Sequence, residues 1–269
     1  MAASGRSEAV AADALAALRE GRQIAPFSAH DSDFTLAEAH AAAARLRETR
    51  VASGWRPVGR KIGFTNRAVQ ETYGISGPIW GTMYDATVSP LGGVFSLAGL
   101  CEPRIEPEIV LHLADAPRAD MDDAALLGCV DWVAHGFEIV HSIYPGWKFT
   151  AADAVAAGGL HGALLLGARH AIDKNRMEWA ASLSGFDIAL SRNGEVVERG
   201  HARNVLGGPV QALRHLVREL AARPEGERLH AGEMVTTGTL TAALPAVAGD
   251  TWTTALSGIA VDGIAVRFT

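Results

Sequence analysis

Cysteine and lysine are scarce in this sequence. There are two cysteines, Cys101 and Cys129, and only three of the 24 basic residues are lysine, so arginine carries nearly all of the positive charge. The cysteines lack C-x-x-C spacing and are too few for a disulfide scaffold, which fits a reducing compartment and two buried apolar side chains. Because lysine is rare, a lysine inside an apolar segment is a candidate for a specific role.

Long apolar runs and basic clusters are also missing. No uninterrupted apolar stretch approaches the roughly 20 residues of a membrane helix, and the first residues lack the basic start and compact apolar segment of a secretory signal. The net charge is −6 and no run of Lys and Arg forms a basic stripe, which disfavours nucleic acid as a partner. We therefore expect a cytoplasmic protein that binds neither nucleic acid nor a membrane.

The composition is that of a globular chain with a sizeable core. Its 269 residues are 48% hydrophobic and 20% charged. Residues 8–22 and 35–50 carry helical periodicity, and the second segment starts with a capping box at Thr35. Short β-branched and aromatic runs separated by turn residues follow. We predict an α+β protein with a helical segment over 1–57, packed on a strand-rich core over 58–269.

The order of strands and helices in the core also carries information. Strand and helix do not alternate regularly, and no G-x-G-x-x-G follows a first strand, which disfavours a Rossmann fold and favours a mostly antiparallel or mixed sheet. Asn193-Gly194 and Asp262-Gly263 are hairpin signals. The predicted strands are 59–64, 87–90, 104–113, 132–142, 162–166, 186–192, 234–239, 251–256 and 259–268, with helices over 122–127 and 209–222.

Three glutamates are candidate metal ligands. Glu106 and Glu108 would project from one face of their predicted strand, about 7 Å apart at a rise of roughly 3.3 Å per residue, and Pro107 between them indicates an edge or a bulge. Glu138 lies in a strongly apolar run and needs a partner, either an arginine such as Arg104 or a metal shared with other carboxylates. Three carboxylates suit Mg²⁺ or Mn²⁺. Surface glutamates and an Arg104–Glu138 salt bridge are the alternative.

Lys61 lies among glycines and apolar neighbours in the stretch GRKIGFTN, residues 59–66. A partly desolvated lysine beside a metal-bound anion could hold a substrate carboxylate or take part in proton transfer, because burial makes its charge state adjustable. A surface lysine with only its stem buried is the alternative. The later stretch 234–239 offers hydroxyls and a glycine at the end of a strand, which suits close approach by a small polar ligand.

These stretches resemble the fumarylacetoacetate hydrolase superfamily, and within it the branch of 2-oxopent-4-enoate (2-keto-4-pentenoate) hydratases and 4-oxalocrotonate decarboxylases of aromatic compound catabolism. The resemblance runs in the family's order from about residue 58 to the end. The matching stretches are GRKIGFTN (59–66), WGTMYDATV (80–88), RIEPEIVLHL (104–113), GFEIVHSIY (136–144), WKF (147–149), VLGGPVQAL (205–213) and AGEMVTTGTLT (231–241).

The resemblance implies a mixed β-roll or sandwich core with the active site at its mouth, and a catalytic domain over 58–269. It implies that Glu106, Glu108 and Glu138 hold Mg²⁺ or Mn²⁺. Lys61 would be the active-site lysine, and a 2-oxo acid would react through an enolate stabilised by the metal. Homo-oligomers are usual in the family. Candidate substrate-binding residues within the matching stretches are Thr65, Trp80, Leu206, Gly207, Thr237, Gly238 and Thr239.

Two positions depart from the hydratase pattern. Hydratases of the branch commonly carry an acidic residue before the aromatic-glycine pair, where this chain has Ile79, which cannot do acid–base work. They also favour an Asp-Asn-x-Ser-Ser stretch, where this chain reads AAGGLHG. His161 in that stretch is either a substituted acid, base or carboxylate binder, or a hydrogen-bonded structural histidine. His141 follows Glu138 by three residues, so in a strand it faces the other way and is expected to be structural.

The main functional hypothesis is a metal-dependent lyase that hydrates a small 2-oxo or 2-hydroxy-dienoic acid such as 2-hydroxypenta-2,4-dienoate. Ile79 and the WKF stretch resemble the decarboxylases more closely, so a decarboxylase of the 4-oxalocrotonate type is the first alternative. Hydrolysis of a C–C bond in an acylpyruvate would need a water-activating dyad that the sequence does not reveal. A 2-oxo acid binding protein without turnover is the last alternative.

Overall fold

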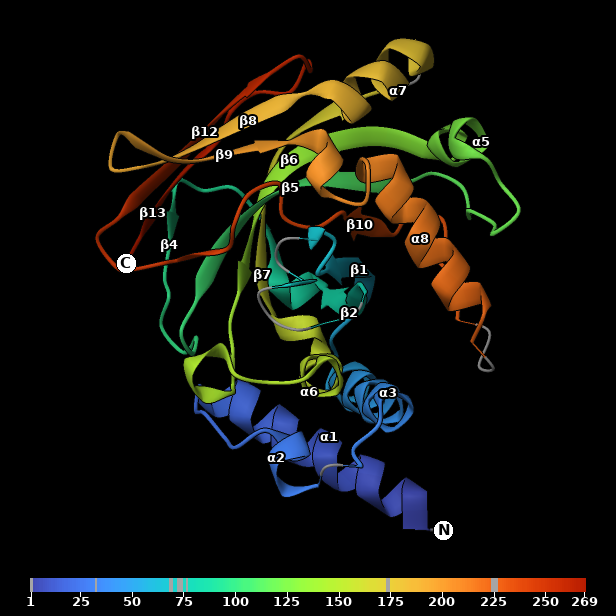
Figure 1. The fold of residues 1–269 in the computed structure, drawn as a ribbon, viewed down its shortest axis with the longest axis vertical. Helices are drawn as coiled ribbons and strands as arrows, with labels where there is room; N and C mark the ends of the chain where they lie inside the picture. The colour runs from blue at the N-terminus through green and yellow to red at the C-terminus, as the bar shows by residue number, and fades with distance from the viewer. Residues whose placement is uncertain are drawn as a thin grey trace.

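In the computed structural model, two β-sheets form the body of the described residues, which are 2–31, 33–67, 70–71, 75, 77–172, 175–223 and 227–269 (Figure 1). The larger sheet is curled and runs in the order β2-β1-β10-β5-β6-β7-β3, with β11 paired to β5. It comprises β1 (Pro57–Gly63), β2 (Ile79–Tyr84), β3 (Val88–Pro90), β5 (Arg104–Leu113), β6 (Val130–Val140), β7 (His161–Ala171), β10 (Met234–Thr236) and β11 (Leu244–Pro245). The smaller sheet, in the order β4-β13-β12-β8-β9, comprises β4 (Val94–Phe95), β8 (Asp187–Arg192), β9 (Glu195–His201), β12 (Thr251–Ser257) and β13 (Ala265–Phe268).

The helices lie in two groups (Figure 1). At one end of the curled sheet, α1 (Ala2–Glu20), α2 (Phe27–His30) and α3 (Leu36–Ala52) lie beside α6 (Ala151–Ala156). Small buried residues such as Ala14, Ala42 and Ala154 allow these helices to approach closely within one apolar cluster. The second group is α5 (Asp123–Gly128), α7 (Arg176–Gly185) and α8 (Pro209–Ala221).

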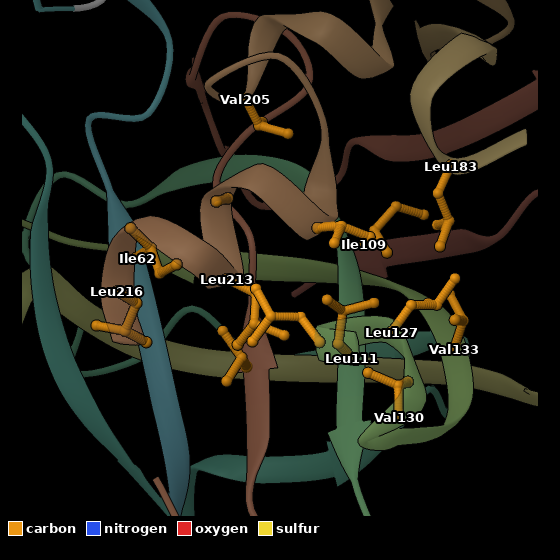
Figure 2. Packing of buried hydrophobic residues seen from close by; sticks show 14 of the residues in the cluster. Ile62, Ile109, Leu111, Leu127, Val130, Val133, Leu183, Val205, Leu213 and Leu216 are labelled. Carbon is orange, nitrogen blue, oxygen red and sulfur yellow. The ribbon is translucent and has the colours of Figure 1, made fainter. Parts of the chain in front are cut away.

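The main apolar core lies between the outer face of the curled sheet and α8 (Figure 2). Ile109 and Leu111 of β5 are fully buried there, together with Leu213 and Leu216 of α8. Full burial of such a side chain stabilises the fold by roughly 1.5–3 kcal/mol. Because side chains alternate along a strand, the residues between them, including Val110, face the inside of the curl. This alternation decides which side chains reach the functional site.

The α+β prediction is confirmed, and several elements match closely. β5 covers the predicted strand 104–113, and α3 begins after Thr35, whose side chain forms the predicted capping box with Glu38. The Asn193-Gly194 turn joins the antiparallel pair β8 and β9. Both residues have positive φ, 53° and 89°, as a two-residue hairpin of this kind requires.

The second hairpin prediction is right about the antiparallel pairing of β12 with β13 and wrong about the turn, which is longer than a two-residue turn at Asp262-Gly263. Asp262 and Gly263 lie within the 258–264 connection between β12 and β13, and the last strand begins only at Ala265. At the end of this connection, Ile264 N donates a hydrogen bond to Thr254 Oγ1 of β12. The sequence pattern does not predict β2, β4, β11, α2, α6 or α7.

Pro107 does not mark an edge or a bulge. β5 is an interior strand, and Pro107 is opposite Phe137 in a regular antiparallel pair with β6. On its other side, β10 and β11 leave a gap in the ladder, where Leu240 N donates to Pro107 O at 3.0 Å. The proline nitrogen points toward this gap, so its missing N–H leaves no sheet hydrogen bond unmade.

Two further expectations concern the cysteines and the membrane. Cys101 and Cys129 are buried free cysteines, as predicted. Within the described part of the chain, the helices are too short or too polar to cross a membrane.

Candidate metal centre and active site

Three carboxylates from two neighbouring strands converge inside the curled sheet. Glu106 on β5 lies directly opposite Glu138 on β6, and Glu108 follows two residues after Glu106 on the same face. One oxygen from each residue lies within 4.8 Å of the others. Glu108 and Glu138 are fully buried. The alternative of two surface glutamates is therefore wrong.

Each buried carboxylate has a different set of partners. Glu138 Oε1 lies 2.8 Å from His161 Nδ1 and 3.3 Å from Lys61 Nζ, and its Oε2 accepts a hydrogen bond from Thr236 Oγ1 at 3.4 Å. Glu108 Oε2 accepts from Gly238 N at 2.7 Å. Glu108 Oε1 is buried without a hydrogen-bond partner among the described residues.

The electrostatics of the cluster favour a bound cation. Burial raises the pKa of Glu108 well above its usual value, and the neighbouring carboxylates raise it further. Burial raises the pKa of Glu106 to about 7, although Lys61 opposes this shift. For Glu138, Lys61 and His161 outweigh burial and lower the pKa. Glu106 and Glu108 are therefore harder to ionise than ordinary carboxyl groups, and a bound cation would favour their ionised form.

Lys61 is almost fully buried, with its side chain 3% exposed. Burial alone would lower its pKa, but the charges of Glu138, Glu106 and Glu108 outweigh burial and raise the pKa above the ordinary value. The ammonium form is therefore stable inside the site. The alternative of a surface lysine is wrong.

A small cavity lies against Glu106, one of the three carboxylates. Four of the predicted site residues line it, namely Lys61, Thr65, Glu106 and Thr239. Its remaining walls are mostly apolar, so a ligand inside would be largely shielded from water. The other lining residues are Gly63, Phe64, Asn66, Val140, Trp147, Gly159, Leu160 and Ala243.

Gly238 can only be glycine in this arrangement. Its φ is +97°, and a Cβ at this position would lie 1.8 Å from Thr65 Oγ1. The glycine lets the 237–241 loop lie against Thr65 while its N–H reaches Glu108. Thr237 Oγ1 donates to Ile109 O at 3.0 Å, so Thr237 fixes the loop to β5.

Trp80, Leu206 and Gly207 do not line the cavity. Trp80 alternates with Gly81 on β2 and faces the opposite side, where its ring stacks on His40. Leu206 N donates to Thr65 O at 3.3 Å, so this segment lies behind Thr65 and supports it.

His161 and His141 are both buried. His161 bridges Glu138 and Thr87, with Nε2 at 2.9 Å from Thr87 Oγ1, and it is not among the residues lining the cavity. This geometry favours the hydrogen-bonded structural alternative over contact with substrate. His141 Nδ1 accepts from Cys101 N at 3.3 Å, and burial lowers the pKa of His141 to about 4.

Sequence reasoning did not assign Trp147 to the site, whereas Ile79 was expected there as a departure from the hydratase pattern. Trp147 forms part of the cavity wall, and its position depends on the preceding Gly146, which has a φ of 65°. The Pro-Gly-Trp triplet at 145–147 was an available signal for a turn that presents an aromatic ring. Ile79 pairs with Gly63 on β1. A Cβ added to Gly63 would lie 3.3 Å from Lys61 Nζ and 3.4 Å from Ile79 Cγ1, so the glycine leaves room for both side chains.

Comparison with known proteins gives consistent matches. The protein-family model described as fumarylacetoacetate (FAA) hydrolase C-terminal matches residues 79–263 of this chain. The chain is 32% identical to 2-hydroxyhexa-2,4-dienoate hydratase from Comamonas testosteroni over 90% of each chain. It is 33% identical to 4-oxalocrotonate decarboxylase from a Pseudomonas species over 80% of each. The structure of 4-oxalocrotonate decarboxylase from Pseudomonas putida G7, complexed with magnesium and adipate, superimposes with a TM-score of 0.90 at 28% identity, covering 98% of both chains.

Proposed function

The chain belongs to the fumarylacetoacetate hydrolase family, and from this premise we propose that it is a divalent-metal-dependent hydratase of a small 2-hydroxy-dienoic acid such as 2-hydroxypenta-2,4-dienoate. The observation that carries the proposal is the cluster of Glu106, Glu108 and Glu138 beneath a small cavity that also contains the Lys61 ammonium. Hydratases and decarboxylases with similar sequences support the reaction class.

We propose that the three glutamates hold Mg²⁺ or Mn²⁺. The residues fit such an ion: carboxylate oxygens are the ligands these hard cations prefer, and Glu108 Oε1 is buried without a hydrogen bond from any described residue. Raised pKa values, as for Glu106 and Glu108, are expected of buried metal ligands in the absence of the cation. When bound, the dication supplies Lewis acidity toward the carboxylate and 2-oxo oxygens of a 2-oxo acid.

Lys61 would act as a cation and proton donor. Its ammonium group lies at the cavity wall, held by Glu138 at 3.3 Å, and the surrounding carboxylates keep it protonated. It can therefore attract a substrate carboxylate or deliver a proton to a carbon that becomes electron-rich. Thr65 and Thr239 offer hydroxyls on the same walls for orienting the substrate.

His161 would act by positioning Glu138. One ring nitrogen contacts the Glu138 carboxylate and the other contacts the Thr87 hydroxyl, so the ring fixes the direction of the carboxylate oxygens. Hydrogen bonds of this kind to a ligand side chain commonly change metal affinity by about 10- to 100-fold.

The direct test is to incubate purified protein with Mg²⁺ and 2-hydroxypenta-2,4-dienoate. The absorbance of the dienol should fall as 4-hydroxy-2-oxopentanoate forms. Lys61→Met should reduce turnover by about 100-fold or more, whereas Lys148→Met, which removes an exposed lysine, should not. Unchanged absorbance with every metal tried would exclude the hydratase activity.

One observation favours a second candidate, a decarboxylase of the 4-oxalocrotonate type. The Arg104 guanidinium lies 4.3 Å from the ring centre of Trp147 and donates to Ala243 O at 3.4 Å, and both of these residues line the cavity. A cation at this rim suits the distal carboxylate of a dicarboxylic acid. If decarboxylation is the reaction, the protein should release CO₂ from 4-oxalocrotonate, and Arg104→Gln should raise KM for that dicarboxylate more than for a monocarboxylic dienoate.

A further inference from the structure

The cavity beside Glu106 extends along β5 and β6, away from the metal ligands. Facing residues of the two strands form successive pairs on the inside of the curl, Glu106 with Glu138 and then Arg104 with Val140. Two residues of strand, or roughly 7 Å, separate these pairs. Val140 lines the cavity together with Glu106. A ligand bound at the carboxylates can therefore run along the strands toward the second pair.

Trp147 lies at this second pair, against the Arg104 guanidinium. The guanidinium carbon is 4.3 Å from the centre of the Trp147 ring, and Arg104 donates to Ala243 O at 3.4 Å. Trp147 and Ala243 line the cavity, whereas Arg104 is not one of the lining residues in the described part of the chain. At this end the cavity is thus bounded by an apolar surface, with the arginine charge behind it.

Three large apolar side chains of the cavity wall are held on unusual backbone. Phe64, Trp147 and Leu160 line the cavity, and their φ angles are 55°, 57° and 63°. Among the described residues, only three others that are not glycine have positive φ. Bulky residues rarely adopt this conformation, and where it persists it is concentrated at ligand-binding and active sites. The backbone is therefore shaped to direct apolar side chains at the ligand.

Glu102 fixes the turn that presents the Trp147 ring. Its Oε1 accepts from Gly146 N at 2.9 Å and from Gln23 Nε2 at 2.8 Å. Its main-chain oxygen accepts from Trp147 Nε1 at 2.9 Å. Gln23 lies between α1 and α2, and it also donates to Ser142 O at 3.2 Å. The N-terminal helical segment is thus connected through Glu102 to the wall of the cavity.

We propose that Trp147 is a specificity-determining residue that selects 2-oxo acids with an uncharged hydrocarbon tail, and that Glu102 is a positioning residue for its ring. This assignment rests on the proposed function, because the metal ligands around Glu106 would hold the 2-oxo acid head. Each CH₂ group buried against the apolar wall strengthens binding about fourfold. A carboxylate at the end of the tail would instead lose its hydration against that wall.

The test is isothermal titration calorimetry of the full chain in Mg²⁺ buffer with three 2-oxo acids that share one head. Pyruvate has almost no tail, and 2-oxohexanoate has an alkyl tail. 2-Oxoadipate has as many carbons as 2-oxohexanoate but ends in a carboxylate. Wild type should bind 2-oxohexanoate about tenfold or more tighter than either of the others. Equal or tighter binding of 2-oxoadipate would overturn the proposal and favour the decarboxylase candidate.

Variants of Trp147 show whether its ring causes the selectivity. Trp147→Ala should reduce the ratio of the Kd values for pyruvate and 2-oxohexanoate to about threefold or less, and should change the Kd for pyruvate less than about twofold. Trp147→Phe keeps an aromatic ring and should retain most of the ratio. Trp179→Ala is the matched control, because it removes an indole from α7, which packs in the other core. A wild-type ratio in Trp147→Ala would overturn the proposal.

Variants of Glu102 test the positioning role. Glu102→Ala removes the acceptor for Gly146 N and should lower the same ratio about threefold or more. Glu102→Gln keeps an oxygen that can accept this hydrogen bond and should retain most of the ratio. A wild-type ratio in Glu102→Ala would exclude the positioning role.

The dienol assay tests the proposed reaction separately. Selectivity for the alkyl tail in a protein that does not turn over the dienol would contradict the hydratase activity and support the role of Trp147. Turnover of the dienol by a protein that binds the three 2-oxo acids equally would support the hydratase activity and overturn the role of Trp147. Absence of binding by all three acids would also overturn it.

Discussion

Replacing Glu106 by glutamine should stabilise the metal-free protein at alkaline pH. The pKa of Glu106 is raised from 4.5 to about 7, chiefly by burial, with Lys61 opposing the shift and Glu138 adding to it. The folded state therefore binds this proton more tightly than the unfolded state, so the free energy of unfolding falls as pH rises from 4.5 through 7. At about 1.4 kcal/mol per pKa unit, the loss above pH 7 reaches about 3 kcal/mol. Glutamine carries no charge, so the variant should not undergo this fall in the free energy of unfolding.

The assay is urea unfolding in EDTA at two pH values. At about pH 8 the Glu106→Gln protein should be more stable than wild type by about 1–3 kcal/mol, the lower figure applying if loss of the Lys61 attraction offsets part of the gain. At about pH 4.5 the two proteins should be nearly equal, because Glu106 is then protonated in the folded wild type. Glu195→Gln, at an exposed position on β9, is the matched control and should show no such pH dependence.

Adding Mg²⁺ should reverse the order of stability. Wild type has three carboxylates for the ion and should be stabilised by binding, whereas the variant with two should gain much less. Two results would refute the reasoning. One is a variant that is less stable than wild type at about pH 8 in EDTA. The other is equal protection of both proteins by Mg²⁺, which would remove Glu106 from the ligand set.

Three further predictions test other parts of the structure. Gly238→Ala should cost about 2 kcal/mol or more in thermal unfolding, because its Cβ would overlap Thr65 Oγ1, whereas Gly232→Ala, at a φ of +87° with open space, should cost less. His161→Gln should weaken Mg²⁺ binding, measured by calorimetry, about tenfold or more. His161→Asn, which keeps a donor at the Nδ1 position, should retain most of the Mg²⁺ affinity. Full Mg²⁺ affinity with lost turnover in His161→Gln would instead make the histidine catalytic. Burial lowers the pKa of His135 to about 4, so its stabilising effect is complete above pH 6.5 and disappears as pH falls through 4. His135→Gln should flatten that part of the acid unfolding curve, and an unchanged curve would contradict the assignment.

The carboxylate cluster could be predicted from local pattern because strand alternation is a short-range property. The sequence around Glu106 and Glu108 specifies a strand and therefore a shared face, and the apolar run around Glu138 specifies burial. The local pattern does not show that Glu138 lies next to Glu106. Their proximity depends on the register that pairs these two residues, and that register is set by the whole β5–β6 ladder.

The side of a strand on which a residue lies was harder to predict where the strand itself was missed. Trp80 belongs to a motif shared with the family, but its ring faces α3 because β2 pairs with β1 in a register that puts Gly81 opposite Lys61. Trp147 reaches the cavity from a turn rather than from a strand, so no periodicity points to it. Both outcomes depend on tertiary packing that short sequence windows do not contain.

The charges of the three glutamates and of Lys61 have to be considered together. Three ionised carboxylates and one ammonium leave two negative charges in excess at a site that is almost completely buried. A buried excess of this size is costly unless the groups take up protons or bind a cation. The raised pKa of Glu106 and Glu108 is the first solution, and a single dication is the second. Proton release should therefore accompany metal binding near neutral pH, which calorimetry in buffers of different ionisation enthalpy can measure. Binding without proton release near pH 7 would mean that the glutamates are already ionised and that the cluster is balanced in another way.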